Sequence, residues 1–84
     1  MNEVWNVLTY RDYDFKDERT GRNVKGRVLH CYRETKEEGW PGIEYGKMSV
    51  PVDSQAYDID PVLGGAYELT FNRHGKVVNL TPVG

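Results

Sequence analysis

The stretch that decides the fold is the connection Asp53-Ser54-Gln55-Ala56-Tyr57-Asp58-Ile59-Asp60-Pro61-Val62-Leu63-Gly64-Gly65. It opens with residues suited to a helix N-cap and has room for about one helical turn before Pro61 and the paired glycines end it. It is also the longest connection after the third β-like segment of the chain. This connection therefore predicts a short helical turn at Asp53–Tyr57, with three strands before it and two after it.

Working outward from this connection, five segments are rich in the β-branched and aromatic residues that favour strands. Polar turns with glycine separate them, at residues 17–23 and at residues 72–75, and Gly21 suits a hairpin loop that needs a positive φ. Residues 34–42 have no apolar periodicity and are predicted to be a loop. The predicted strands are Val4–Phe15, Val24–Arg33, Ile43–Val52, Ala66–Phe71 and Lys76–Val83.

Alternation of side chains assigns the faces of these strands. In the first strand the odd positions are expected to share one face, and in the last strand Val78 is expected beside Leu80. In the third strand, Met48 and Val50 are expected opposite the face that carries Tyr45 and Lys47. Pro51 cannot donate to a ladder, so it predicts a strand end or a sheet edge.

These segments predict one all-β domain over residues 1–84. The predicted fold is a small five-stranded OB-type barrel with a short helical connection between strands three and four. The long first strand and the position of the longest connection favour this plan. An SH3-like barrel is the alternative, because five short strands alone do not separate the two.

Composition limits the setting in which the chain works. The 84 residues suit one domain, and the single cysteine, Cys31, cannot close a disulfide within the chain. No apolar run is long enough to span a bilayer, and the first residues lack the order of a signal peptide. We therefore expect a cytoplasmic protein that does not bind membranes.

The charges are unevenly distributed, although the net charge is only −2. Residues 11–33 contain seven basic and four acidic residues, whereas residues 34–68 contain two basic and eight acidic ones. A chain of this kind can carry one basic face and stay nearly neutral overall.

Two parts of the chain resemble known proteins. The segment Asp14–Gly26, with Phe15, Gly21 and Gly26 in the arrangement Phe-x-x-x-x-x-Gly-x-x-x-x-Gly, resembles the first hairpin of small OB-fold single-stranded DNA-binding proteins of phages and mobile elements. The stretches Gly64–Leu69 and Phe71–Val77 are similar to the last hairpin of small proteins from Gram-positive bacteria and their phages. In length and layout the chain also resembles the filamentous-phage single-stranded DNA-binding proteins, which implies a homodimer. The acidic segment Glu34–Glu44 departs from this pattern.

Single-strand binding requires cations for phosphates and aromatic faces for bases. In OB domains the usual surface is the face of strands two and three with the loops that flank it. The residues expected to bind nucleic acid are Lys16, Arg19, Arg22, Lys25, Arg27, Trp40, Tyr45, Lys47, Arg73 and His74.

Two points about this surface stay open in the sequence. Lys25 and Arg27 share their strand phase with Leu29 and Cys31, which look buried, unless a bulge near Gly26 reverses the faces. Trp40 and Tyr45 are candidates for stacking on bases. The remaining ring-bearing candidates, which we expect to pack in the core, are Trp5, Tyr13, Tyr32 and Tyr57.

The sequence offers little for catalysis. His30 and Cys31 are neighbours on a strand and point to opposite faces, so they cannot act together. One cysteine and two distant histidines do not supply three or four converging metal ligands. We therefore expect a non-enzymatic protein without metal, cofactor or small-molecule substrate. Its expected partner is single-stranded DNA or RNA, and the alternative is a protein-interaction or assembly module.

Overall fold

The computed structural model describes residues 2–35, 38–39 and 41–83, which contain five strands and one short 3₁₀ helix. The strands lie where the sequence predicts them, with ends that differ by a few residues. The helical turn begins two residues later than predicted, after Ser54 as its N-cap. The elements are β1 (Asn2–Lys16), β2 (Asn23–Glu34), β3 (Ile43–Pro51), η1 (Gln55–Asp58), β4 (Ala66–Phe71) and β5 (Val77–Pro82).

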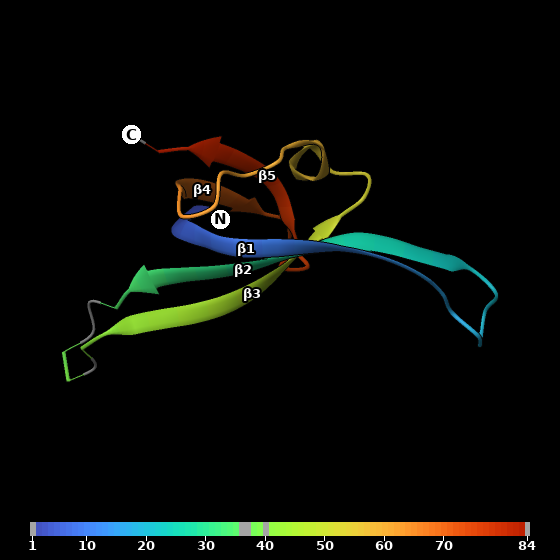
Figure 1. Cartoon of the computed structure of the whole chain (residues 1–84), viewed down its shortest axis with the longest axis horizontal. Helices are drawn as coiled ribbons and strands as arrows, with labels where there is room; N and C mark the ends of the chain where they lie inside the picture. The colour runs from blue at the N-terminus through green and yellow to red at the C-terminus, as the bar shows by residue number, and fades with distance from the viewer. Residues whose placement is uncertain (1, 36–37, 40, 84) are drawn as a thin grey trace.

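The strands form one antiparallel sheet in the order β3-β2-β1-β4-β5 (Figure 1). After η1 the chain returns to place β4 beside β1 and not beside β3. A fourth strand that returns to the first is the Greek-key arrangement, which is the basis of the OB plan. The SH3-like alternative requires β3 and β4 to be neighbours, so the strand order favours the OB-type fold.

The sheet curls without closing through hydrogen-bonded strand pairs in the described part of the chain. Its two ends, β3 and β5, come into contact, and η1 packs against both of them. OB-type barrels are commonly open to this extent. The connection between strands three and four therefore fills the gap that strand pairing leaves.

Leu8 forms a β-bulge in β1 that reverses which side chains face the core. Val7 pairs with Cys31, and the next pair is Thr9 with His30, so Leu8 has no partner of its own on β2. Because one extra residue shifts the alternation, odd positions face the core before the bulge and even positions face it afterwards. The predicted single odd face along the whole first strand is wrong for this reason.

The backbone of Val7 is held on its other side by the paired glycines. Its N–H donates to the Gly65 carbonyl at 2.9 Å, and its carbonyl accepts from the Gly64 N–H at 2.7 Å. A second irregularity lies between Thr70 and Phe71, where the β5 partners pass from Asn79 to Val77.

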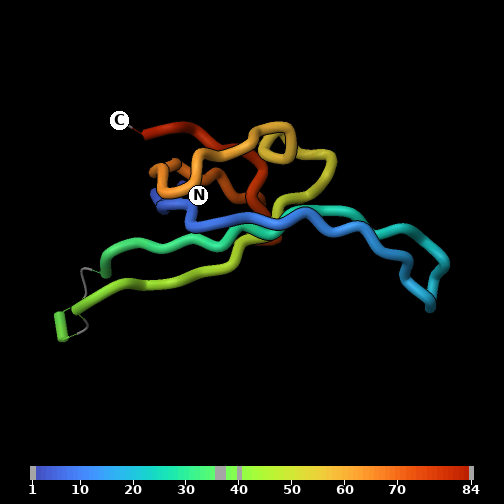
Figure 2. Tube along the Cα trace, in the orientation of Figure 1, coloured from blue at the N-terminus to red at the C-terminus, as the bar shows by residue number. Residues whose placement is uncertain are grey.

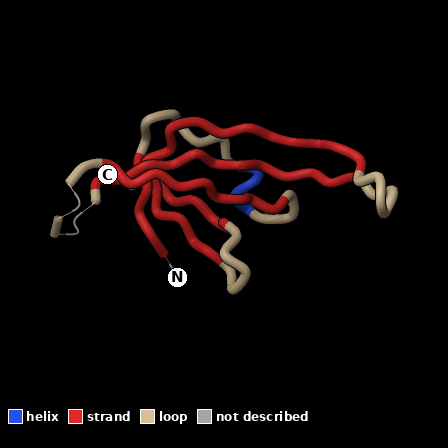
Figure 3. The backbone as a smooth tube through the Cα atoms, turned by 90° about the horizontal axis from the view of Figure 1, so that it is seen from below, coloured by secondary structure: helices blue, strands red, loops and turns tan. Residues whose placement is uncertain are grey.

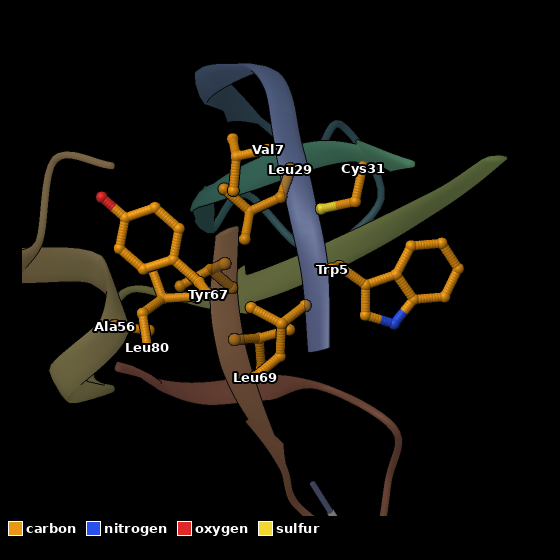
Figure 4. Close-up of a cluster of buried hydrophobic side chains, with 10 residues drawn as sticks. Trp5, Val7, Leu29, Cys31, Ala56, Tyr67, Leu69 and Leu80 are labelled. Atoms are coloured by element: carbon orange, nitrogen blue, oxygen red, sulfur yellow. The ribbon is translucent and has the colours of Figure 1, made fainter. Parts of the chain in front are cut away.

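The core lies on the inner face of the curled sheet, with side chains from every strand and from η1 (Figure 4). Val77 and Leu80 are both buried, because the irregularity between them shifts the alternation of side chains along β5 by one residue. The expectation that Val78 shares a face with Leu80 is therefore wrong. The expected core position of Trp5 is confirmed. The buried hydrophobic residues are Trp5, Val7, Leu29, Cys31, Val50, Ala56, Tyr67, Leu69, Val77 and Leu80.

Two hairpins reach beyond this core at opposite ends of the molecule, which measures 47 × 27 × 24 Å (Figures 2 and 3). One is the β1–β2 hairpin, whose turn at residues 17–22 contains Gly21 with the predicted positive φ of +71°. The other is the β2–β3 hairpin. In the described residues no helix is long and apolar enough to cross a membrane.

Cys31 provides a native probe of this core. Its thiol is fully buried, and burial raises its pKa to about 11. Because the thiolate is the reactive form, we expect the folded protein to react with an aromatic disulfide reagent only through unfolding. The measurement is the labelling rate at pH 8 with and without denaturant. Rapid labelling of the folded protein would contradict the described core.

Candidate functional site

Arg27 lies inside the domain, which corrects the expectation that it belongs to an exposed binding surface. Arg27 is only 5% exposed, and its side chain lies on the inner face of the sheet with those of Leu29 and Cys31. The bulge that would have moved it outward is absent, because Gly26 pairs regularly with Tyr13 on β1. Arg27 therefore keeps the strand phase of Leu29 and Cys31 and is buried with them.

The guanidinium of Arg27 joins β2 to β1 and to the connection after η1. Its Nε donates to Asp12 Oδ1 at 2.5 Å, and its Nη1 donates to the Ile59 carbonyl at 2.7 Å. It also lies over the rings of Tyr10 and Tyr57, at 4.7 and 5.1 Å from their centroids. The hydrogen bond with Asp12 raises the pKa of Arg27 and lowers that of the Asp12 carboxyl. The group acts as a structural clamp, and Tyr57 packs against the core as predicted.

Arg33 is similarly engaged at the other end of the inner face. It forms ion pairs with Glu44 at 3.0 Å and with Glu3 at 3.1 Å, and it lies over the Trp5 ring at 4.1 Å. The hydrogen bond with Glu44 is the main reason that the pKa of Arg33 is raised. Two of the basic residues counted in residues 11–33 therefore hold the fold together.

The side of β1, β2 and β3 that points away from the core forms the candidate site, here called the outer face. Strand register and the bulge at Leu8 assign its members. They combine aromatic rings, two cations and small or aliphatic side chains. The central part of the outer face carries Thr9, Arg11, Tyr13, Val28, His30, Tyr32, Tyr45, Lys47 and Ser49, and its outward positions toward the strand ends include Asn6, Phe15, Glu34 and Ile43.

Three rings gather at one end of the outer face, here called the three-ring cluster: His30, Tyr32 and Tyr45. Tyr32 and Tyr45 are directly opposite each other on β2 and β3. The Tyr45 hydroxyl forms a short hydrogen bond with His30 Nδ1, and the two ring centroids are 6.0 Å apart. Tyr45 is 54% exposed, so its ring is available to a ligand.

Two further rings, here called the two-ring cluster, lie where β1 extends into the long hairpin. Tyr13 and Phe15 have centroids 6.0 Å apart, and Phe15 is 55% exposed. The Tyr13 ring lies across Gly26, where an added Cβ would come within 2.4 Å of the Tyr13 hydroxyl. Tyr13 and Tyr32 thus lie outside the core cluster, and the prediction that they pack in the core is wrong.

The outer face differs in charge from the rest of the chain. Arg11 and Lys47 are exposed on it, and Lys47 lies directly opposite His30. Strands β1 to β3 are described in full, and their only outward acid is Glu34 at the far end of β2. The described acids of β1 to β3 other than Glu34 are Glu3, Asp12, Asp14 and Glu44, which occupy inner positions.

The predicted cations of the long hairpin occupy a different position. Arg19 and Arg22 are exposed in its turn, and Lys16 is exposed at the end of β1. Lys25 is exposed on the inner side of the hairpin, with its Nζ 3.8 Å from Asp14. The β1–β2 hairpin, which carries these residues, extends beyond the rest of the sheet (Figure 1).

The β4–β5 turn supplies cations in two places. Lys76 lines a shallow depression with Lys25, Tyr13 and Ser49, at the point where β3 ends. Arg73 instead lines a separate depression with Glu3. His74 is exposed at the tip of the turn. The cations predicted to form one site therefore lie apart. Lys25 lines the depression next to the outer face, and Arg73 lines the depression that contains Glu3.

Trp40, the favoured stacking candidate in the sequence, lies outside the described residues. Of the other predicted site residues, Tyr45 and Lys47 lie together on the outer face. Sequence reasoning missed Arg11, His30 and Lys76 as members of this region. An assignment of strand faces that allowed for a bulge near Leu8 would have placed Arg11 on the outer face. No feature of the sequence around Leu8 predicts that bulge.

The arrangement suits binding better than chemistry. His30 and Cys31 point to opposite faces, as predicted, and Cys31 is fully buried. No group of three His, Cys, Asp or Glu side chains suited to a metal ion occurs in the part of the chain that the structure describes. What the outer face offers is ring surface and cationic side chains on a rigid sheet.

No protein-family model, curated protein or solved structure matches this chain.

Proposed function

We propose that this chain is a non-enzymatic protein that binds single-stranded DNA with low sequence specificity on its outer face. The observation that carries the proposal is the combination of exposed rings with Arg11 and Lys47 on one side of β1–β3. Stacking on aromatic side chains contributes about 1–3 kcal/mol per base and tolerates any base, because every base has a π-face. In the setting that the resemblance implies, the protein coats strands during replication or transfer of a phage or mobile element.

The strand order supports the same surface. In OB-type domains the face of strands two and three and the adjoining loops bind oligonucleotides. Here that face carries the three-ring cluster, and at the opposite end it borders the depression in which Lys25, from the inner side of the hairpin, and Lys76 lie together with Asp53. The negative net charge does not oppose the proposal, because the acids lie mainly away from this face.

The test is a fluorescence-anisotropy titration of fluorescein-labelled oligothymidine over a range of salt concentrations. For single strands the logarithm of affinity falls with the logarithm of salt at a slope of about −0.7 per phosphate contact. Two to four contacts from Arg11, Lys47, Lys25 and Lys76 predict a slope of about −1.4 to −2.8. No binding at low salt, or binding that does not respond to salt, would contradict the proposal. Oligouridine in parallel shows whether RNA is also bound.

A homodimer is part of the proposal. In the described residues β3 has β2 as its only hydrogen-bonded strand partner, and it also contacts β5 and η1. The part of β3 in the hairpin that projects away from β5 and η1 (Figure 1) offers an edge that can accept a strand from a second copy. Light scattering at several protein concentrations gives the mass in solution. A monomer at all concentrations would remove the dimer and leave the binding proposal intact.

A protein-interaction module is the second candidate, and one observation favours it. Val62 and Leu63, in the connection before β4, are 70% and 58% exposed, and Leu8 is 52% exposed. Exposed apolar side chains of this kind are found at protein–protein contacts. If oligothymidine does not bind at low salt, this candidate replaces the first.

A further inference from the structure

The distance between the two-ring cluster and the three-ring cluster follows from the positions on β2 beside which they lie. Tyr13 pairs with Gly26, whereas the three-ring cluster uses His30 and Tyr32 on the same strand. The intervals from position 26 are four and six residues. At about 3.3 Å per residue these correspond to about 13 and 20 Å.

The surface between the clusters carries the cation Arg11, and Lys47 lies beside His30 at the near edge of the three-ring cluster. Arg11 lies opposite Val28, and Lys47 lies opposite His30, both on the outer face. Ser49, opposite Val28 on β3, contributes a small polar side chain. A chain of alternating bases and phosphates laid along β2 would meet rings, then Arg11, then rings with Lys47 beside them.

We propose that one single strand runs along β2 and stacks on both clusters at once, with one phosphate on Arg11 between the clusters and another on Lys47 beside His30. This inference rests on the proposed function and adds the path and length of the ligand. A stacked strand rises about 3.4 Å per nucleotide, so a gap of about 13 to 20 Å corresponds to about four to six stacked nucleotides. A strand that crossed β1, β2 and β3 would instead engage one cluster only.

Phe15 and Tyr45 give a matched pair of variants, because they are 55% and 54% exposed and belong to different clusters. The experiment measures the affinity of wild type, Phe15→Ala and Tyr45→Ala for oligothymidines of about 3 to 16 nucleotides, which extend from just below the smallest to the largest site size of about 4–16 nucleotides per OB fold. Circular dichroism and the slow labelling of Cys31 verify the fold of each variant. Leu63→Ala is the control outside both clusters.

The proposed path predicts different results for short and long ligands. An oligomer that reaches both clusters binds more tightly because it occupies two linked binding sites. Each variant therefore weakens the affinity for this oligomer by about 5- to 150-fold. An oligomer too short to span can use the remaining cluster, so a single variant weakens it by about twofold.

Two results would overturn the inference. The first is that Phe15→Ala binds the long oligomers as tightly as wild type while Tyr45→Ala does not, which places the strand across the sheet. The second is equal affinity for the shortest and longest oligomers. If wild type binds no oligomer, the proposed function itself fails, and that result is distinct from the other two.

Discussion

Replacing Arg27 with alanine will lower the free energy of unfolding by about 2–4 kcal/mol, the largest stability loss expected among the basic residues predicted from the sequence to bind nucleic acid. The side chain is 6% exposed and donates to Asp12 and to the Ile59 carbonyl. Its loss removes charge-assisted hydrogen bonds and leaves Tyr10 and Tyr57 without the cation between them. Asp12 is half exposed, so water can solvate it after the change, and this limits the cost. Chemical denaturation measures the effect.

Arg22→Ala is the matched control, because Arg22 is an exposed arginine in the hairpin turn. An exposed substitution of this kind changes stability by about 0.5 kcal/mol or less. Arg27→Lys should not restore stability, because an ammonium cannot reproduce the planar fork. Equal losses for Arg27→Ala and Arg22→Ala would contradict the clamp.

The ion pair between Arg27 and Asp12 makes the free energy of unfolding depend on pH in a definite direction. The pKa of Asp12 in the folded protein is lowered from its usual 3.8, chiefly by the hydrogen bond with Arg27. The folded carboxyl therefore contributes stability above about pH 4, and this contribution is lost as the pH falls through its folded pKa. The stability difference between wild type and Asp12→Asn should be full at pH 7 and should shrink below about pH 4.

Replacing Tyr45 with alanine will weaken binding of a long oligothymidine by about 5- to 150-fold, the equivalent of about 1–3 kcal/mol of stacking. Tyr45 is more than half exposed and lies outside the core, so the fold should tolerate the change. The measurement is the dissociation constant at one fixed salt concentration, since binding to phosphates depends on salt.

Tyr45→Phe separates stacking from the hydroxyl. It keeps the ring and removes only the hydrogen bond to His30, so its affinity should stay close to that of wild type. Leu63→Ala, at an equally exposed apolar residue, should have no effect on affinity. If Tyr45→Ala and Leu63→Ala behave alike, the three-ring cluster is not the stacking surface.

The fold was largely predictable because its signals are local. Strand composition, the polar turn around Gly21 and the strand-ending Pro51 act over a few residues. The connection at residues 53–65 also carried topological information, because a helical turn at that place separates three strands from two. The strand order then followed from the Greek-key arrangement.

The candidate site was less predictable because it depends on contacts between distant residues. The bulge at Leu8 coincides with hydrogen bonds from Val7 to Gly64 and Gly65, which are more than fifty positions away in the chain. That single shift turns Arg11 and Tyr13 outward and Asp12 toward Arg27. Simple alternation therefore assigned the wrong face to the second half of β1. In β2 alternation was right, because it placed Arg27 with Leu29 and Cys31, and the surface role predicted for Arg27 came from the usual binding face of OB domains.

The measurement that tests the central claim most directly is a two-dimensional NMR titration of the labelled protein with an oligothymidine of about eight nucleotides, within the site sizes of OB domains. We expect the largest shifts at Arg11, His30, Tyr32, Tyr45 and Lys47 on the outer face, with little change at Val62 and Leu63. Shifts confined to the connection before β4, or no shifts at low salt, would contradict that claim.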